Sequence, residues 1–147
     1  MNTKQTLRGF ATISYWAEDM EAAKAWYAEL LGIAPYFERS GPDGRPVYAE
    51  FRIGDYQHEL GLIDRRFAPA QAAIGSGGAI MYWHVDDIET TFNRLKAMGA
   101  EEYEPIQHRG EGFITASVLD PFGNVLGIMY NQHYLDMLCF MKGDHHK

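Results

Sequence analysis

The sequence predicts an α+β fold built from two tandem copies of one βαβββ module. The order of β-prone and helical segments occurs twice, and so do the signals that end the helices. The copies keep an offset of about 67 residues, as between Gly32 and Gly99. We place the modules at about 9–66 and 77–131, a linker at 67–76 and an apolar helical extension at 132–142.

Each copy opens on a β-prone run that ends in an acidic pair and is followed by a helical period. The two runs are Ala11–Met20 and Ala79–Ile88. Beyond them, apolar residues recur at the spacing of one helix face. They are Met20, Ala23, Tyr27, Leu30 and Leu31 in the first copy and Ile88, Phe92, Leu95 and Met98 in the second. One amphipathic helix is therefore predicted in each copy.

Both predicted helices carry boundary signals. Gly32 and Gly99 stand where a left-handed residue ends a helix. Asp86 and Glu89 have the spacing of a capping box at the start of the second helix. These signals predict matching helix boundaries in the two copies.

Three further strands are predicted in each copy, because short β-prone runs there are separated by turn residues. They are Tyr36–Arg39, Val47–Ile53 and Gln57–Asp64 in the first copy and Tyr103–Gln107, Phe113–Leu119 and Val125–Tyr130 in the second. The last strands of the two copies have similar sequences, LGLI at Leu60–Ile63 and LGIM at Leu126–Met129. One such module has an open sheet edge and half a core, so we expect the two to complete each other.

Composition excludes several classes of protein. The net charge of −7 argues against general nucleic-acid binding, which needs a basic surface. No apolar run reaches the length of about 18 residues that a membrane span needs. The single cysteine, Cys139, permits no intramolecular disulfide, and we expect it in a core or an interface. With no apolar signal segment at the start, a reducing, cytoplasmic setting is expected.

Three motifs give the chain a resemblance to a known family. Ala17–Met20 and Val85–Ile88 resemble its V-x-D-hydrophobic junction, and Ala25–Gly32 resembles its F-Y-x-x-x-L-G helix end. Asp120–Gly127 resembles its D-P-x-G-n turn before the last strand. From about Gly9 to Asn131 the chain is thus similar to the vicinal oxygen chelate superfamily of glyoxalases, bleomycin-resistance proteins and dihydroxybiphenyl dioxygenases.

This resemblance implies an incomplete eight-stranded barrel around a cavity, formed by the two modules, and a homodimer. It leaves the function open, because members of the superfamily include enzymes as well as proteins that sequester a drug. The residues that line the cavity therefore have to decide the function.

Side-chain alternation separates the two faces of each inner strand. Ile13, Tyr15 and Ala17 in the first copy and Met81, Trp83 and Val85 in the second form the more apolar faces, which suit packing under a helix. By elimination, the more polar set lines the concave side. The predicted ligand-binding residues are Thr12, Ser14, Trp16, Tyr82 and His84, together with Glu59 and Met129.

The resemblance also implies where a divalent metal would bind, with one ligand from each of four strands. The matching positions are Thr12, Ile80, Gly127 and either Gly61 or Glu59. Isoleucine and glycine side chains offer no donor, and a metal site needs several converging donors. We therefore predict no metal centre of the family type and no other cofactor.

Two residues are candidates for catalysis, each with a structural alternative. His84 is either a general acid or base near neutral pH or a hydrogen-bonded histidine in the cavity wall. Glu59 is either an acid–base group or a carboxylate paired with Arg52 or His84. Trp16 and Tyr82 either stack on a flat ligand or fill the barrel.

The sequence favours a metal-independent protein that binds a small, partly aromatic or apolar molecule in the barrel. The alternative is a superfamily enzyme, such as a lactoylglutathione lyase-like lyase, an isomerase or a dioxygenase, with a non-standard metal site. A third interpretation is an interaction module whose barrel is filled by side chains.

Overall fold

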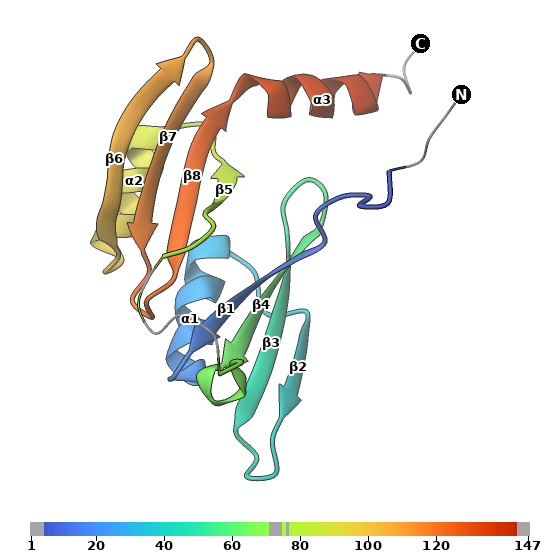
Figure 1. Cartoon of the computed structure of the whole chain (residues 1–147), viewed down its shortest axis with the longest axis vertical. Helices are drawn as coiled ribbons and strands as arrows, with labels where there is room; N and C mark the ends of the chain where they lie inside the picture. The colour runs from blue at the N-terminus through green and yellow to red at the C-terminus, as the bar shows by residue number, and fades with distance from the viewer. Residues whose placement is uncertain (1–4, 71–74, 76, 144–147) are drawn as a thin grey trace. The chain divides into compact units, whose positions relative to one another are not determined.

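The computed structural model describes residues 5–70, 75 and 77–143, so part of the predicted linker, residues 71–74 and 76, lies outside the described residues. The chain divides into two compact units near residue 72. Each unit contains one four-stranded sheet and one helix packed on it (Figure 1).

The first unit has the order strand, helix and three strands. Its elements are β1 (Thr12–Ala17), α1 (Met20–Leu31), β2 (Phe37–Ser40), β3 (Pro46–Ile53) and β4 (His58–Asp64), followed by the short 3₁₀ helix η1 (Arg65–Phe67). The sheet order is β1-β4-β3-β2. The strand β1 runs parallel to β4, and the other neighbours are antiparallel.

The second unit repeats this arrangement. Its elements are β5 (Met81–His84), α2 (Ile88–Ala97), β6 (Glu101–Gly110), β7 (Phe113–Leu119) and β8 (Val125–Asn131). The sheet order β5-β8-β7-β6 is that of the first unit, again with one parallel pair at the start. The prediction of two tandem βαβββ modules in an α+β fold is confirmed. The closure of the two sheets into a barrel stays a prediction.

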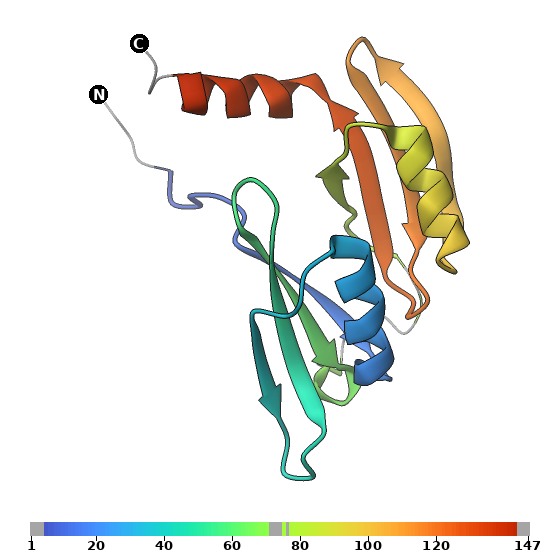
Figure 2. The same cartoon turned by 180° about the vertical axis from the view of Figure 1, so that it is seen from behind.

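Each helix covers one face of its own sheet, as the view from behind shows (Figure 2). In the first unit the ring of Tyr15 on β1 lies 5.9 Å from that of Tyr27 on α1, which is fully buried. In the second unit Phe92 and Leu95 of α2 are buried, as is Val118 of β7. The predicted periodicity of both helices therefore identifies the side that builds each core.

Two of the three predicted helix boundary signals are confirmed. Asp19 begins α1 by accepting a hydrogen bond from the Ala22 backbone N–H at 3.0 Å. Gly32 and Gly99 follow the two helices with positive φ, as predicted. The predicted capping box of Asp86 and Glu89 is wrong.

The residue that caps α2 is Asp87. Its carboxylate accepts a hydrogen bond from the Thr90 backbone N–H at 3.1 Å. The backbone of Asp87 is extended, which is the conformation of a residue that precedes a helix. Asp86 lies one residue too early and contacts His84 instead.

A third helix, α3 (Gln132–Gly143), begins directly after β8 and points away from the second sheet (Figures 1 and 2). None of its residues is buried, although most of them are apolar. Cys139 is exposed here, so the structure excludes a place in the core for it. No helix in the described part of the chain is long and apolar enough to span a membrane.

Candidate functional site

The face of each sheet opposite its helix is called here the helix-free face. On the first sheet the strand register places Thr12 beside Glu59 and Ser14 beside Gly61. It also places Trp16 beside Ile63, so the three candidate side chains of β1 lie on one face. That face is opposite Tyr15, which contacts α1.

Glu59 is held by two neighbours on the helix-free face of the first sheet. Its Oε1 accepts a hydrogen bond of 2.8 Å from the Thr12 hydroxyl. Its Oε2 lies 3.6 Å from Nη2 of Arg52, the ionic partner that the sequence offered as one alternative. Both oxygens of this carboxylate therefore have a partner within the first unit.

Arg52 connects Glu59 to a second carboxylate. Its Nε lies 3.7 Å from Oε2 of Glu50, too far for a hydrogen bond, and it is buried without another partner among the described residues. The guanidinium lies 3.8 Å from the centre of the Tyr36 ring, a cation–π distance. One arginine thus lies between two glutamates and against an aromatic ring.

A row of four residues crosses each helix-free face at the same level, and we call it the glycine row. On the first sheet it consists of Ser14, Gly61, Glu50 and Phe37. On the second sheet it consists of Tyr82, Gly127, Ser117 and Glu104. The glycine lies in the last strand of its module in both rows.

A tyrosine ring lies against the glycine in each module. On the first sheet, a Cβ atom added to Gly61 would be 3.1 Å from the Tyr48 ring and hydroxyl. The Tyr48 hydroxyl donates a 2.9 Å hydrogen bond to Glu50. Burial, and then this hydrogen bond, raise the pKa of Tyr48 to about 12, so the phenol remains a hydrogen-bond donor even in moderately alkaline solution.

The second sheet has the same combination in a different arrangement. A Cβ atom added to Gly127 would be 2.7 Å from Cδ1 of Tyr82. The Tyr82 hydroxyl donates a 3.1 Å hydrogen bond to Oε1 of Glu104, and the Ser117 hydroxyl donates to the same oxygen at 3.0 Å. Burial, and then the Glu104 hydrogen bond, raise the pKa of Tyr82.

His84 has a partner at each ring nitrogen. Its Nδ1 accepts a 3.2 Å hydrogen bond from the Asn131 backbone N–H, which places the ring proton on Nε2. Nε2 lies 3.2 Å from Oδ1 of Asp86. The ring stacks on Tyr134 of α3 at 4.7 Å and 7°, and only 8% of the side chain is exposed. This geometry favours the structural alternative for His84.

Trp16 and Met129 are the two predicted ligand-binding residues that remain to be placed. Trp16 is half-buried beside Ile63, and Met129 is half-buried beside His84 in the register of the second sheet. The sulfur of Met129 lies 3.6 Å from Nδ2 of Asn131. Each sheet therefore combines aromatic or sulfur-bearing side chains with fixed polar groups on its helix-free face.

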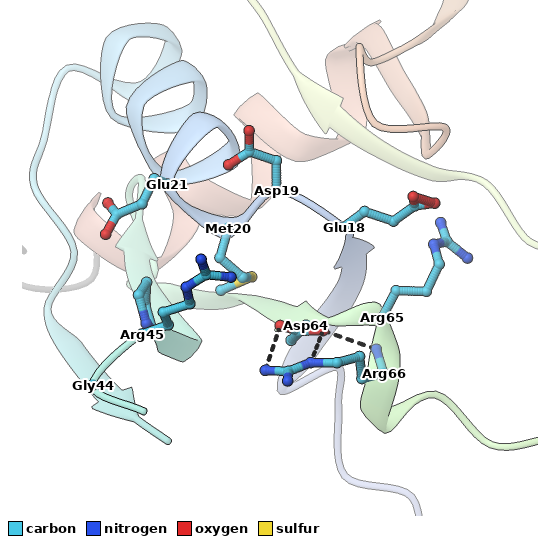
Figure 3. A pocket seen from close by; sticks show the side chains of 10 residues that line it. Glu18, Asp19, Met20, Glu21, Gly44, Arg45, Asp64, Arg65 and Arg66 are labelled. Atoms are coloured by element: carbon cyan, nitrogen blue, oxygen red, sulfur yellow. Dashed lines mark hydrogen bonds and ion pairs between the residues drawn. The ribbon is translucent and has the colours of Figure 1, made fainter. Parts of the chain in front are cut away.

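A cleft of about 930 Å³ lies elsewhere on the first unit (Figure 3). Its lining is mainly charged and consists of Glu18, Asp19, Met20, Glu21, Gly44, Arg45, Pro46, Asp64, Arg65 and Arg66. Arg66 binds Asp64 with its Nε at 3.1 Å and lowers the pKa of that carboxyl. No predicted ligand-binding residue lines this cleft, and its charged walls do not suit an apolar ligand.

Comparison with known families agrees with this fold. The model of the Glyoxalase/Bleomycin resistance protein/Dioxygenase superfamily matches residues 9–128. The chain belongs to this superfamily. Comparison with curated proteins gives no significant sequence match.

Solved structures of superfamily proteins share the fold at low sequence identity. A glyoxalase-related enzyme from Fulvimarina pelagi has 21% identity and a TM-score of 0.66, over 86% of this chain and 90% of that one. A bleomycin resistance determinant encoded on transposon Tn5 has 22% identity and a TM-score of 0.57, over 88% and 98%. Lactoylglutathione lyase from Agrobacterium tumefaciens has 20% identity and a TM-score of 0.59, over 85% and 95%.

The residues at the superfamily's four metal positions do not fit a divalent metal. The register makes Gly61 the counterpart of Gly127, and these glycines and Ile80 offer no side-chain donor. The adjacent Glu59 is already engaged by Thr12 and Arg52. Among the described residues, no group of three or more His, Cys, Asp or Glu side chains could hold a metal ion.

Several residues of the helix-free faces were missed by sequence reasoning. On the first sheet, Tyr48 and Glu50 follow the alternation of β3, so that signal could have found them. On the second sheet, Glu104 and Arg109 lie on β6, whose register shifts three times. Alternation cannot be followed through such shifts, so the sequence held no usable signal for these two.

Proposed function

We propose that this superfamily member is a cytoplasmic, metal-independent protein that binds a small, partly aromatic or apolar molecule. The proposed binding surface is the helix-free face of the sheets. The observation that carries the proposal is the tyrosine laid against a glycine and fixed by a glutamate, present in both modules. Small-molecule sites combine aromatic walls with a few oriented polar groups, and this arrangement supplies both.

The seven predicted residues take defined places in this proposal. Trp16, Tyr82 and Met129 supply surface for an aromatic or apolar ligand. Ser14 offers a hydroxyl group, and the Thr12 oxygen, whose proton is donated to Glu59, can still accept a hydrogen bond. His84 and Glu59 act by positioning their neighbours, since the polar atoms of both side chains are engaged.

The test is a calorimetric titration with 2-naphthol, a flat aromatic probe with one hydroxyl group. We expect saturable binding that weakens roughly tenfold in Trp16→Ala, because a stacking contact is lost. The control is Trp26→Ala, which removes a tryptophan from α1, on the other face of the first sheet. Equal binding by both variants would contradict a role for Trp16.

Metal removal separates this proposal from the enzymatic alternative. We expect dialysis against EDTA to leave 2-naphthol binding unchanged, because the four superfamily positions lack a converging donor set. Binding that is lost with EDTA and restored by Zn²⁺ or Mn²⁺ would favour a superfamily enzyme with a non-standard metal site. Metal content measured on the same samples gives an independent readout.

We also propose that α3 is covered by a second copy of the chain. Its side chains Met137, Phe140 and Met141 are 40, 62 and 49% exposed, and a helix this apolar is normally buried. We expect the purified chain to be a dimer by light scattering and Phe140→Asp to be monomeric. Phe67→Asp, which changes an equally exposed phenylalanine outside α3, is the control. A monomeric wild type would overturn this proposal.

A further inference from the structure

Glu104 differs from the other glutamates of the helix-free faces in its partners. Its carboxylate is half-buried, and its Oε1 accepts hydrogen bonds from Tyr82 and Ser117. It forms no ion pair with any residue in the described parts of the chain. On the first sheet, in contrast, Glu50 and Glu59 share the guanidinium of Arg52.

Arg109 lies in the neighbourhood of Glu104 but forms no ion pair with it in the described part of the chain. The charge of Arg109 acts on Tyr82, the hydrogen-bond donor to Glu104. However, Nε of Arg109 donates to the Thr115 hydroxyl at 3.1 Å. The Glu104 carboxylate therefore has two neutral hydroxyl donors and no cation paired with it.

One oxygen of this carboxylate has no hydrogen-bond partner among the described residues. A carboxylate has about four acceptor positions, two on each oxygen. Tyr82 and Ser117 both donate to Oε1, so Oε2 accepts nothing from the described residues. A partly desolvated charge without a counter-ion is unfavourable, and a cation that donates a hydrogen bond to Oε2 would relieve it.

We propose that Glu104 anchors a cationic N–H group of the ligand, an ammonium, amidinium or guanidinium, through Oε2. The aromatic or apolar part of that ligand then lies against the Tyr82 ring, which is hydrogen-bonded to Glu104, and against the Met129 side chain. Met129 belongs to β8, two strands from Glu104 on the same face of the sheet. This inference rests on the proposed small-molecule binding and adds the charge of the ligand to it.

The test compares two probes of nearly equal size and shape, the cation benzamidine and the neutral benzamide. We expect the wild-type chain to bind benzamidine at least tenfold more tightly than benzamide in a calorimetric titration. In Glu104→Gln, benzamidine binding should weaken at least tenfold while benzamide binding is unchanged. The amide oxygen of glutamine can still accept from Tyr82 and Ser117, so the fold should be retained.

Two controls make the result specific. Glu101→Gln changes the net charge equally from an exposed position on the same strand and should alter neither titration. Ser117→Ala keeps the carboxylate and should keep the benzamidine preference. If Glu104→Gln fails to fold, the comparison of benzamidine with benzamide on the wild-type chain still tests the inference.

The possible failures are distinguishable. Equal binding of benzamidine and benzamide by the wild type, or a preference that survives in Glu104→Gln, would overturn this inference and leave the proposed function standing. Binding of none of the three probes, 2-naphthol included, would overturn both.

Discussion

Replacing Gly127 by alanine is expected to destabilise the chain by about 3 kcal/mol, the upper part of the range for overpacking a filled site. The added Cβ atom would be 2.7 Å from Cδ1 of Tyr82, 2.8 Å from Cγ2 of Ile80 and 2.9 Å from the carbonyl oxygen of Met81. The carbonyl cannot retreat cheaply, because Met81 belongs to β5, which is paired with β8. Urea unfolding followed by circular dichroism measures the loss.

Two other glycines provide matched controls. A Cβ atom at Gly61 would be 3.1 Å from atoms of the Tyr48 side chain only, which can shift, so we expect a loss of about 1 kcal/mol. At Gly110 nothing lies within 4 Å, and alanine there should change stability little. If the Gly127 and Gly110 variants unfolded at the same urea concentration, close packing of Tyr82 on Gly127 would be contradicted.

The same geometry explains why a side chain at position 127 and the Tyr82 ring exclude each other. Position 127 matches one of the metal positions that the family resemblance implies, and the Tyr82 ring lies 2.7 Å from where a Cβ atom at position 127 would be. A donor introduced at position 127 would displace the ring, whose hydroxyl holds Glu104. A tyrosine ring also lies against the glycine of the first module, where a Cβ atom added to Gly61 would be 3.1 Å from Tyr48.

The fold could be predicted because its signals are local and occur twice. A β-prone run bounded by turn residues predicted Phe113–Leu119 with the bounds that β7 has. The two helices followed from apolar spacing and from the glycines that end them. The cap of α2 was predicted one residue too early, because two adjacent aspartates precede the helix and the sequence does not tell which carboxylate accepts from the first turn.

The candidate site could be predicted only where strands are regular. Alternation along β1 predicted that Thr12, Ser14 and Trp16 share one face. The unbroken register between β1 and β4 agrees with this. The partners of these side chains lie on other strands, and cross-strand pairing cannot be derived from one strand's pattern. Glu104 shows this most clearly, since its donors come from β5 and β7 and its own strand is irregular.

Replacing His84 by alanine is expected to destabilise the second unit by about 2 kcal/mol, the cost of leaving a backbone donor unsatisfied and losing a stacked ring. The lost contacts are the hydrogen bond from the Asn131 N–H and the stacking on Tyr134. Both contacts lie at the junction of β8 and α3. We therefore expect α3 to be the region where backbone amide hydrogen exchange accelerates most.

His84→Asn separates this positioning role from catalysis. The asparagine oxygen can accept from the Asn131 N–H as Nδ1 does, so this variant should keep more than half of the stability that alanine loses. An acid–base histidine needs a ring nitrogen free to reach a reacting group, whereas both nitrogens of His84 contact neighbours of its own unit. Unchanged exchange in α3 and unchanged stability in His84→Ala would contradict the positioning role and return His84 to the candidates for catalysis.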